Sequence, residues 1–333
     1  MQVCKKCILN EKYPGIRFDD KGVCNFCNSH KPEDPERNTK KKYEKRFRDL
    51  IAEFRGRGIY DCLIAYSGGK DSSFTLHLTK TEYDLNILAV TFDNWFQSET
   101  AHQNVRSVIK NMNLDHLTVR PRFESFKGIM RACVYNKLYS MKALQRSSTI
   151  CTTCLWLIRA TCYKLAIEKE IPFVMFGLSP GQAPVATSVF KTNPKMLETM
   201  QNAIYHPLRE IVGESVDSFF LQKRHFEEGG NFPYTINPLA FTHYDENEFI
   251  RVAESYGWRK PTDTDVNSTN CLLNAFANEV HIKQNGFHPY AFEIAGLVRE
   301  GFLTREEGLK KMNEPPNPEV IAFVKKALDI HDI

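Results

Sequence analysis

The residues best suited to chemistry lie in the stretch Ser67–Ser72, which reads Ser-Gly-Gly-Lys-Asp-Ser. A short apolar run, Cys62–Tyr66, precedes it, and apolar residues at helical spacing follow from Phe74. A strand that ends in two glycines and opens a helix presents backbone N–H groups and the positive end of a helix dipole to an anion. The hydroxyl and ammonium groups of the stretch add further donors. The pattern therefore predicts a phosphate-binding loop; a plain Ser/Gly turn with a solvated lysine is the alternative.

The loop resembles the PP-loop of the ATP-pyrophosphatases and lacks the Walker A pattern G-x-x-x-x-G-K-[ST]. This resemblance implies a Mg²⁺-dependent enzyme that cleaves ATP between its α- and β-phosphates. Such an enzyme adenylates an acceptor oxygen and releases pyrophosphate, and a nucleophile then displaces AMP. The resemblance also implies that Lys70 holds the pyrophosphate and that Asp71 lies near Mg²⁺. The implied nucleotide-binding residues in the loop are Ser67, Gly68, Gly69, Lys70, Asp71 and Ser72.

Predicted strands alternate with predicted helices after the loop. The strands are Leu85–Asp93, His116–Val119 and Ile171–Gly177. This alternation predicts an α/β fold with a doubly wound parallel sheet, which the resemblance makes a sheet of the PP-loop (HUP-like) type. Ligands bind such sheets at the carboxyl ends of the strands, so Asp93 and Gly177 share a rim with the loop. We expect both to contact the nucleotide or the acceptor, although Asp93 could instead cap the next helix.

Four cysteines near the start have the spacing of a metal site. They form two CxxC pairs separated by sixteen residues, namely Cys4, Cys7, Cys24 and Cys27. This spacing is typical of a structural zinc site with four thiolate ligands. A rubredoxin-like iron site is an alternative, because sequence does not choose the metal. A module of this size cannot bury a core of its own, so the metal would supply its folding energy.

A third CxxC pair, Cys151 and Cys154, is expected immediately before a helix over Leu155–Glu168. A helix N-terminus lowers the pKa of a thiol, which favours metal binding or nucleophilic attack. Cys271 lies far downstream in a polar turn, Asn267–Asn274, so only tertiary folding can bring it to the pair. The alternative is a separate zinc or redox pair with Cys271 unrelated. The other cysteines (Cys62, Cys133 and Cys162) are expected in the core.

The order of loop, CxxC pair and remote cysteine resembles the iron–sulfur members of the PP-loop group, the tRNA 2-thiolation sulfurtransferases. The resemblance implies that Cys151, Cys154 and Cys271 hold a [4Fe-4S] cluster by three of its irons and take part in catalysis with Lys70 and Asp71. It implies a sulfur donor and a tRNA acceptor. The 2-thiouridine branch has a second zinc module at its C-terminus, which this sequence lacks, and this weakens the expectation of tRNA.

A second resemblance, to the N-acetyl sugar amidotransferases, rests on both ends of the chain. It is carried by the opening CKKCILNEKYPGIRFDDKGVCNFC and the tail GLVREGFLTREEGLKKMNEPP. It implies that ammonia from a glutaminase partner replaces the oxygen of an acetamido group on a nucleotide-linked sugar. A non-catalytic nucleotide- or nucleic-acid-binding module is a third hypothesis. Both resemblances imply a homodimer.

Composition and domain boundaries complete the predictions. A net charge of +4 and 42% hydrophobic residues are typical of a soluble globular protein. No apolar run reaches the roughly 18 residues of a membrane helix, and no signal peptide is seen, so we expect a cytoplasmic protein without membrane contact. The predicted units are a Cys4 zinc module (1–30), a linker helix (31–58), the PP-loop domain (59–280) and a helical C-terminal extension (281–333). Residues 121–150 and 183–230 are expected to be helical, and later helices are expected over Asp245–Tyr256, Leu272–Gln284 and Arg305–Met312.

Overall fold

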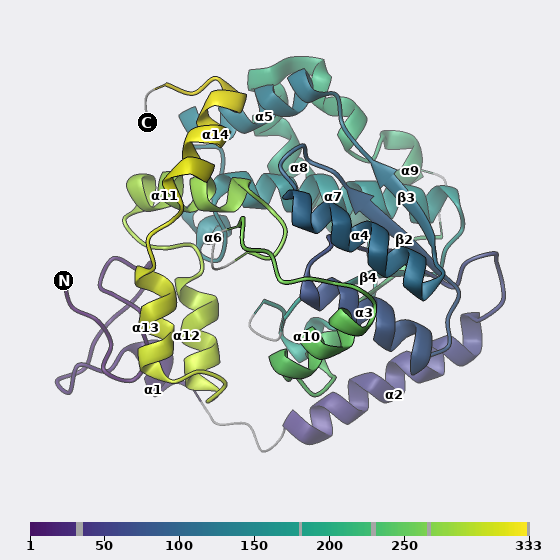
Figure 1. Cartoon of the computed structure of the whole chain (residues 1–333), viewed down its shortest axis with the longest axis horizontal. Helices are drawn as coiled ribbons and strands as arrows, with labels where there is room; N and C mark the ends of the chain where they lie inside the picture. The colour runs from purple at the N-terminus through teal and green to yellow at the C-terminus, as the bar shows by residue number, and fades with distance from the viewer. Residues whose placement is uncertain (31–35, 180–181, 228–230, 265–267, 332–333) are drawn as a thin grey trace.

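The computed structural model describes residues 1–30, 36–179, 182–227, 231–264 and 268–331 (Figure 1). Parts of three predictions lie outside these ranges. They are the start of the predicted linker, two positions of the loop after Gly177, and Asn267 in the turn before Cys271.

A six-stranded sheet forms the centre of the fold, in the order β3-β2-β1-β4-β6-β5. All neighbouring strands are parallel except β5, which runs antiparallel to β6 at one edge. This confirms the predicted α/β sheet. Strands β2 and β3 are added on one side of β1, and β4 is added on the other side. A doubly wound sheet opens a crevice for ligands at this change of side, between β1 and β4. The strands are β1 (Cys62–Ala65), β2 (Ile87–Phe92), β3 (Asp115–Val119), β4 (Phe173–Phe176), β5 (Val189–Lys191) and β6 (Tyr234–Ile236).

Helices cover both faces of the sheet, because side chains alternate between the faces along each strand. In β1, Cys62 and Ile64 belong to one buried cluster and Leu63 to the other. The first cluster packs under α2 (Glu36–Phe54), α3 (Lys70–Thr81), α4 (Glu99–Met112) and α10 (Glu246–Ser255). The second packs under α5 (Phe123–Tyr135), α7 (Thr149–Glu168), α8 (Pro194–Val212), α11 (Leu273–Asn285) and α14 (Pro318–Leu328). Shorter helical segments are α1 (Asn25–Asn28), α6 (Met141–Leu144), η1 (Val185–Thr187), η2 (Gly213–Phe219), α9 (Lys223–Glu227) and η3 (Pro238–Ala240).

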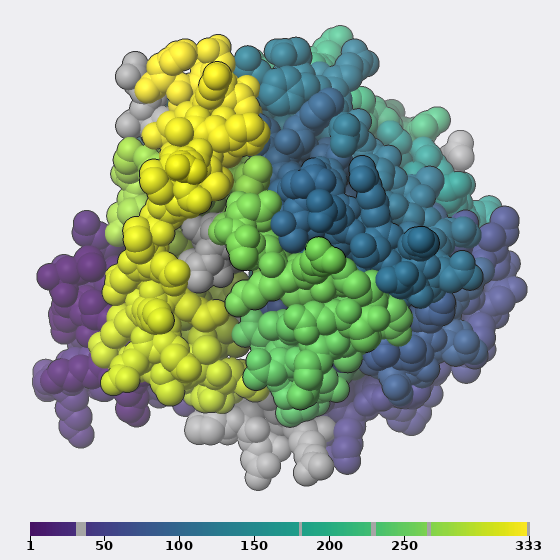
Figure 2. All heavy atoms as spheres, in the orientation of Figure 1, coloured from purple at the N-terminus to yellow at the C-terminus, as the bar shows by residue number. Residues whose placement is uncertain are grey.

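A third, smaller core joins the two ends of the chain. Buried residues of the N-terminal module pack against α12 (Ala291–Arg299) and, at its margin, α13 (Arg305–Asn313). The guanidinium of Arg305 donates hydrogen bonds to the carbonyl oxygens of Cys4 and Cys7, at 3.1 Å each. In Figure 2 the purple N-terminal residues lie directly against the yellow C-terminal helices. The module thus shares its core with residues almost 300 positions away, and the predicted boundary at residue 281 falls inside α11.

Three predicted elements differ from the structure. Helix α7 begins at Thr149 rather than after Cys154, because Ser148 caps it by accepting a hydrogen bond from the Cys151 N–H at 3.0 Å. Residues 121–150 are not one helical stretch, and residues 183–230 include the edge strand β5 as well as helices. By length and composition α7 is apolar enough to cross a membrane, but 56% of its most apolar window is buried inside this fold.

Candidate functional site

The PP-loop follows β1 and opens α3 at the strand reversal. Gly68 has φ +78°, and a Cβ there would lie 2.8 Å from the Ala101 carbonyl oxygen, so a residue with a side chain would clash. The Ser67 hydroxyl accepts the Gly69 N–H at 3.3 Å and lies 3.1 Å from the Ser72 hydroxyl. Gly69 caps α3 without a side-chain hydrogen bond, which leaves the first turn of the helix open to an anion.

Lys70 is held by carboxylates from two elements. Its Nζ lies 2.9 Å from Asp71 Oδ2 and 3.4 Å from Glu246 Oε1 at the start of α10. Burial alone would lower the pKa of Lys70, but the charges of Asp71, Tyr244 and Glu246 and the hydrogen bond to Asp71 raise it well above its ordinary value. The ammonium is therefore protonated throughout the neutral range and can neutralise phosphate charge.

Gly177 lies against the first turn of α3, as the shared rim predicts. A Cβ at this position would lie 2.7 Å from Thr75 Oγ1 and 3.0 Å from Ser72 Cα. In the loop after Gly177, the backbone N–H of Ser179 donates to the Gln182 side chain at 3.1 Å. The end of β4 can lie this close to α3 only because Gly177 has no side chain.

Glu293 on α12 is a site residue that the sequence did not reveal. Ser179 donates to its carboxylate at 3.0 Å. Burial raises the pKa of Glu293, and the charge of nearby Asp71 raises it further, whereas hydrogen bonds from Ser179 and Gln182 and the charge of Lys70 lower it. The signal available beforehand was a lone carboxylate in the otherwise apolar start of a helix, AFEIA.

Asp93 is buried at the end of β2 and already has partners. Its carboxylate pairs with Arg120, whose Nε donates at 2.8 Å, and accepts the Trp95 backbone N–H at 2.9 Å. The alternative that Asp93 caps the next helix is wrong, because Ser98 caps α4 by accepting from the Ala101 N–H. Asp93 instead shapes the loop that carries the next residues toward the cysteines.

The fold brings Cys151, Cys154 and Cys271 together, although Cys271 lies on a different element. Asn94, directly after Asp93, places its amide Nδ2 3.6 Å from Cys154 Sγ and 3.5 Å from Cys271 Sγ. The two sulfurs are thus no farther apart than the sum of these distances. Cys151 lies three positions before Cys154 on the same helix, α7, which places the two side chains on one face of it.

Burial raises the pKa of all three thiols, to about 12 for Cys151, and mutual repulsion adds to this for Cys151 and Cys154. Three converging thiols that do not ionise easily by themselves are what a metal centre can stabilise as thiolates. Hydrogen bonds to the sulfurs, such as those from Asn94, are typical of iron–sulfur ligands. The donor set therefore fits an iron–sulfur cluster held by three cysteines.

The segment that carries Cys271 contacts the PP-loop. Residues 96–98 pair with residues 270–272: the Ser98 N–H donates to Asn270 at 3.0 Å, and the Leu272 N–H donates to Phe96 at 2.8 Å. The side chains of Gln97 and Asn270 each donate to the Ser67 carbonyl oxygen at 3.3 Å. One short segment thus carries Cys271 and touches the nucleotide loop. Sequence reasoning missed Asn94, Gln97 and Asn270; their positions after β2 and beside Cys271 were the available signal.

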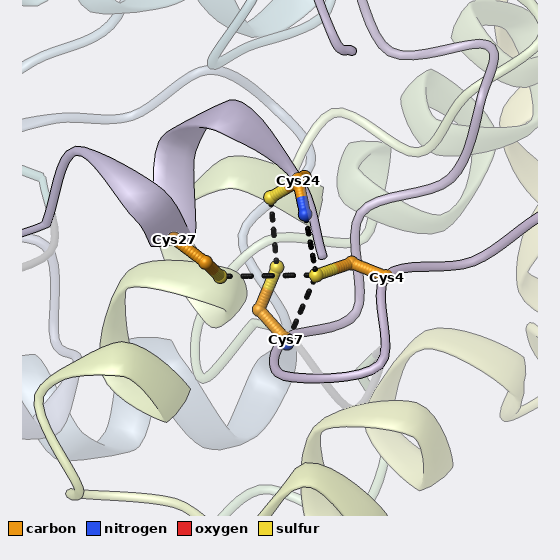
Figure 3. A group of neighbouring side chains, drawn as sticks. All are labelled: Cys4, Cys7, Cys24 and Cys27. Atoms are coloured by element: carbon orange, nitrogen blue, oxygen red, sulfur yellow. Dashed lines mark hydrogen bonds between the residues drawn. The ribbon is translucent and has the colours of Figure 1, made fainter. Parts of the chain in front are cut away.

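The four N-terminal cysteines converge on one point, as Figure 3 shows. All are buried, and their sulfurs lie within 4.8 Å of one another. Burial would raise the pKa of Cys4, but the N–H groups of Cys7, Cys24 and Lys6 lower it to about 7, whereas burial raises that of Cys7 to about 11. Four thiols at this spacing fit one tetrahedral ion, with zinc the metal expected for four thiolates.

Sequence comparisons give two distant relatives. No protein-family model matches the chain. An uncharacterized protein of Methanocaldococcus jannaschii, MJ1599, is 25% identical over 320 residues, which is 96% of this chain and 95% of that protein. The glutamine-hydrolyzing GMP synthase of Baumannia cicadellinicola is 24% identical over 179 residues, half of this chain and 34% of the synthase.

Comparison with solved structures gives the NH3-dependent NAD synthetase of Campylobacter jejuni, which is 12% identical, with a TM-score of 0.36 over 88% of this chain and 93% of the synthetase. The U34-tRNA thiolase NcsA of Methanococcus maripaludis, solved with its [4Fe-4S] cluster, is 17% identical, with a TM-score of 0.37 over 100% of this chain and 99% of the thiolase. A likeness of this extent does not establish an activity.

Proposed function

We propose that this protein is an ATP-pyrophosphatase that adenylates an acceptor oxygen and replaces it with sulfur at the cysteine triad. The contact between the two sites carries the proposal. Asn270 donates to the Ser67 carbonyl of the nucleotide loop, and the next residue is Cys271. An adenylate formed at the loop would lie beside the triad, so activation and substitution could follow without release of the intermediate.

The loop residues would perform the first half of the reaction. The open first turn of α3 and the ammonium of Lys70 would bind the pyrophosphate portion of ATP, with Mg²⁺ near Asp71. As the acceptor oxygen attacks the α-phosphorus, negative charge grows on the departing pyrophosphate. Lys70 would stabilise that charge, which lowers the barrier.

The triad would perform the second half. A cluster bound by Cys151, Cys154 and Cys271 would supply an iron that can carry sulfide. Asn94 would orient two of these ligands and place hydrogen bonds on their sulfurs. Sulfide from a donor would attack the adenylated carbon, and AMP would leave with the original oxygen.

A second candidate function uses ammonia in place of sulfide, with a glutaminase partner and an N-acetyl sugar as acceptor. The similarity of half of the chain to a glutamine-hydrolyzing synthase favours it, as does the likeness of both chain ends to the sugar amidotransferases. Both candidate functions use the same nucleotide site.

A non-catalytic nucleotide-binding role is the third candidate, and pyrophosphate release would exclude it.

Metal and sulfide analysis of protein purified without oxygen tests whether sulfur or nitrogen is transferred. Sulfur transfer predicts a brown protein with roughly four iron and four sulfide per chain in addition to zinc. Cys271→Ser should lose the iron and keep the zinc, whereas Cys162→Ala, a core thiol on the same helix α7, should keep both. Colourless protein with zinc alone, even after anaerobic reconstitution, would favour nitrogen transfer.

Pyrophosphate release tests the nucleotide site separately. Lys70→Ala should abolish ATP-dependent pyrophosphate release without changing the metal content. Lys110→Ala, an exposed lysine on α4, is the matched control and should leave the activity unchanged. Full activity in Lys70→Ala would refute the assignment of the loop.

A further inference from the structure

A small pocket lies over the ends of β2 and β3. Its walls come from these two strand ends, the start of α5, the middle of α7 and η2. The pocket has a volume of about 280 Å³. None of its lining residues belongs to the loop 67–72 or to the cysteine triad, so the pocket is independent of the proposed function.

One part of the pocket wall is apolar. Phe92 and Val119 are the last residues of β2 and β3, and Leu165 and Phe219 come from α7 and η2. All four side chains pack with the second core of the fold. The volume is nearly twice the roughly 150 Å³ of a cavity that holds one benzene molecule. The space therefore fits one ring or short alkyl chain together with a compact head group.

The other part of the wall is cationic. Arg122 at the start of α5 and Lys164 on α7 both line the pocket, and no carboxylate does. Within the described ranges neither cation forms an ion pair, and the ammonium of Lys164 lies 3.5 Å from the Ser218 carbonyl oxygen. Lys164 is half-buried. A partly desolvated cation without an anion is unfavourable, so an anion entering the pocket would compensate it.

The acidic residues nearest to the pocket in sequence have other partners or point elsewhere. Asp217 on η2 pairs with Arg209 at 3.0 Å, and Glu168 on α7 pairs with Arg224 at 3.5 Å. Glu124, in the first turn of α5, is exposed and does not line the pocket. The positive charge of the pocket is therefore not cancelled by its own walls.

Two hydroxyl groups in the wall can donate hydrogen bonds to such an anion. Ser125 on α5 and Ser218 on η2 line the pocket, and neither hydroxyl has a hydrogen-bond partner in the part of the chain that the structure describes. The hydroxyls of Thr161 and Ser215, which also line it, already donate to backbone carbonyl oxygens. The available donors are therefore two cations and two hydroxyls, from three elements.

We propose that this pocket binds a small phosphate monoester with an apolar or aromatic body. A phosphate monoester carries about two negative charges and three terminal oxygens. These match the charges of Arg122 and Lys164 and leave an oxygen for the free hydroxyls of Ser125 and Ser218. A carboxylate offers one charge and two oxygens, which is less than the wall can bind. The body of the ligand lies against the apolar wall.

Calorimetric titration of the full chain with phenyl phosphate tests the proposal. Its Kd should be lower by about tenfold or more than the Kd of inorganic phosphate, phenol or benzoate. Inorganic phosphate lacks the ring, phenol lacks the charged head group, and benzoate lacks the second charge. Lys70→Ala should bind phenyl phosphate as the unmodified protein does, which separates the pocket from the nucleotide loop.

Lys164→Met keeps the apolar stem of the side chain and removes its charge. It should raise the Kd for phenyl phosphate by about tenfold or more, because a hydrogen bond to a charged group is lost. Arg122→Gln, at an exposed position, should have the same effect and serves as an independent variant. Lys169→Met is the matched control, since it removes an exposed lysine at the end of the same helix, and should leave the Kd unchanged.

Four results would overturn the proposal. The first is the absence of saturable binding at millimolar phenyl phosphate, and the second is equally tight binding of inorganic phosphate, phenol or benzoate. The third is loss of binding in Lys70→Ala, which would mean that phenyl phosphate occupies the nucleotide loop. The fourth is an equal effect of Lys164→Met and Lys169→Met, which would reduce the binding to general charge. Because Lys70 and the triad do not line the pocket, none of these results bears on ATP cleavage or sulfur transfer.

Discussion

Lys70 is surrounded by more negative charge than it can balance. Asp71 and Glu246 pair with its ammonium, and Glu293 lies close enough for its charge to interact with both Lys70 and Asp71. ATP would bring further negative charge into the same space. A divalent cation entering with the nucleotide would remove this repulsion, which is a physical reason for the Mg²⁺ requirement that the PP-loop resemblance implies.

Gly177→Ala tests how tightly β4 and the loop are fitted together. The added methyl group would lie 2.7 Å from Thr75 Oγ1 and 3.1 Å from the Asp71 carbonyl oxygen, so the first turn of α3 must shift. We expect a lower Tm and an ATP Kd raised by about tenfold or more, because misplacement by about 1 Å is costly at a catalytic site. Gly128→Ala, in α5 with its nearest neighbour 3.9 Å away, should leave both unchanged or raise the Tm slightly. Unaltered ATP binding in Gly177→Ala would show that the rim tolerates movement.

Two histidines, the buried His281 and the half-buried His288, predict a loss of stability in acid. Burial lowers the pKa of His288 from 6.5 to about 4, and burial together with the charge of His288 lowers that of His281 to about 4. Between these pH values the unfolded chain binds protons that the native protein does not, so the free energy of unfolding falls as the pH drops from about 6.5 toward 4. Denaturant unfolding at several pH values measures this slope, and His288→Asn should reduce it. An identical slope in the variant would exclude His288 as the cause.

At the residue scale, the sequence revealed the groups whose types are rare and whose spacing is short. The loop and the two N-terminal CxxC pairs are of this kind, and the triad was proposed from the order of its motifs. Gln97, Asn270 and Glu293 could not be found in this way. Glutamine, asparagine and glutamate are common on protein surfaces. Gln97 and Asn270 are distinguished only by their tertiary contact with Ser67, and Glu293 only by its position near Lys70 and Asp71.

At the level of elements, the first turns of α7 hold the CxxC pair in place. Because the helix begins at Thr149, Cys151 and Cys154 are three helical positions apart and share one face. Thr153, between them in sequence, points instead into the second core and contacts Tyr139 and Cys133. A pair placed before the helix would not have this fixed orientation.

Ser148→Ala tests whether the cap of α7 positions the pair. Loss of the hydrogen bond to the Cys151 N–H should destabilise the protein by about 1 kcal/mol. It should also weaken retention of iron, measured as metal content after exposure to a chelator. Asn193→Ala removes the corresponding cap of α8, where the side chain accepts from the Met196 N–H, and should cost similar stability without loss of iron. Equal iron retention in the two variants would show that the cap matters for stability alone.

Strands were easier to predict than helix boundaries. β1, β2 and β4 lie within apolar runs, because both faces of the sheet are covered there, whereas β3 is a mostly exposed edge strand. The predicted ends of these four strands differ from the observed ones by at most two residues. The three-residue edge strand β5 is too short to leave a pattern. Helices α12 and α14 lie in the predicted helical extension, but their positions were not predicted individually. The start of α7 was displaced because its cap, Ser148, is one serine of a pair in a polar stretch.

On the scale of the whole molecule, the N-terminal module and the active-site rim are linked through α12. Helix α12 contributes Ile294 and Ala295 to the core around the four cysteines. Its Glu293 lies close enough to Lys70 and Asp71 for the charges to interact. The predicted division into successive units did not anticipate this arrangement, because the pairing of residues 1–27 with residues 287–312 leaves no local signal. A change in the metal site can therefore reach the nucleotide site through one helix.

Removal of the N-terminal metal should loosen more than the module. Cys7→Ser should increase amide hydrogen exchange in α12 and α13, which share the module's core, and leave α14, in the main core, as protected as before. It should also lower the Mg²⁺ concentration that ATP binding requires, because displacing Glu293 removes negative charge from the surroundings of Lys70. Exchange confined to residues 1–30 would mean that α12 and α13 hold their places without the metal.

The shared core at the two ends of the chain also sets an order of events during synthesis. Cys4–Cys27 leave the ribosome well before Phe287 and Ala291, which cover them. At about 5–20 residues per second the interval is on the order of tens of seconds. Through that time the nascent module has no covering helices, so a metal ion held by its four cysteines would be the main force that can keep it ordered. A cell short of this metal would release chains whose first residues are unfolded when α12 arrives, and the defect would appear as poor yield of finished protein rather than as slow turnover.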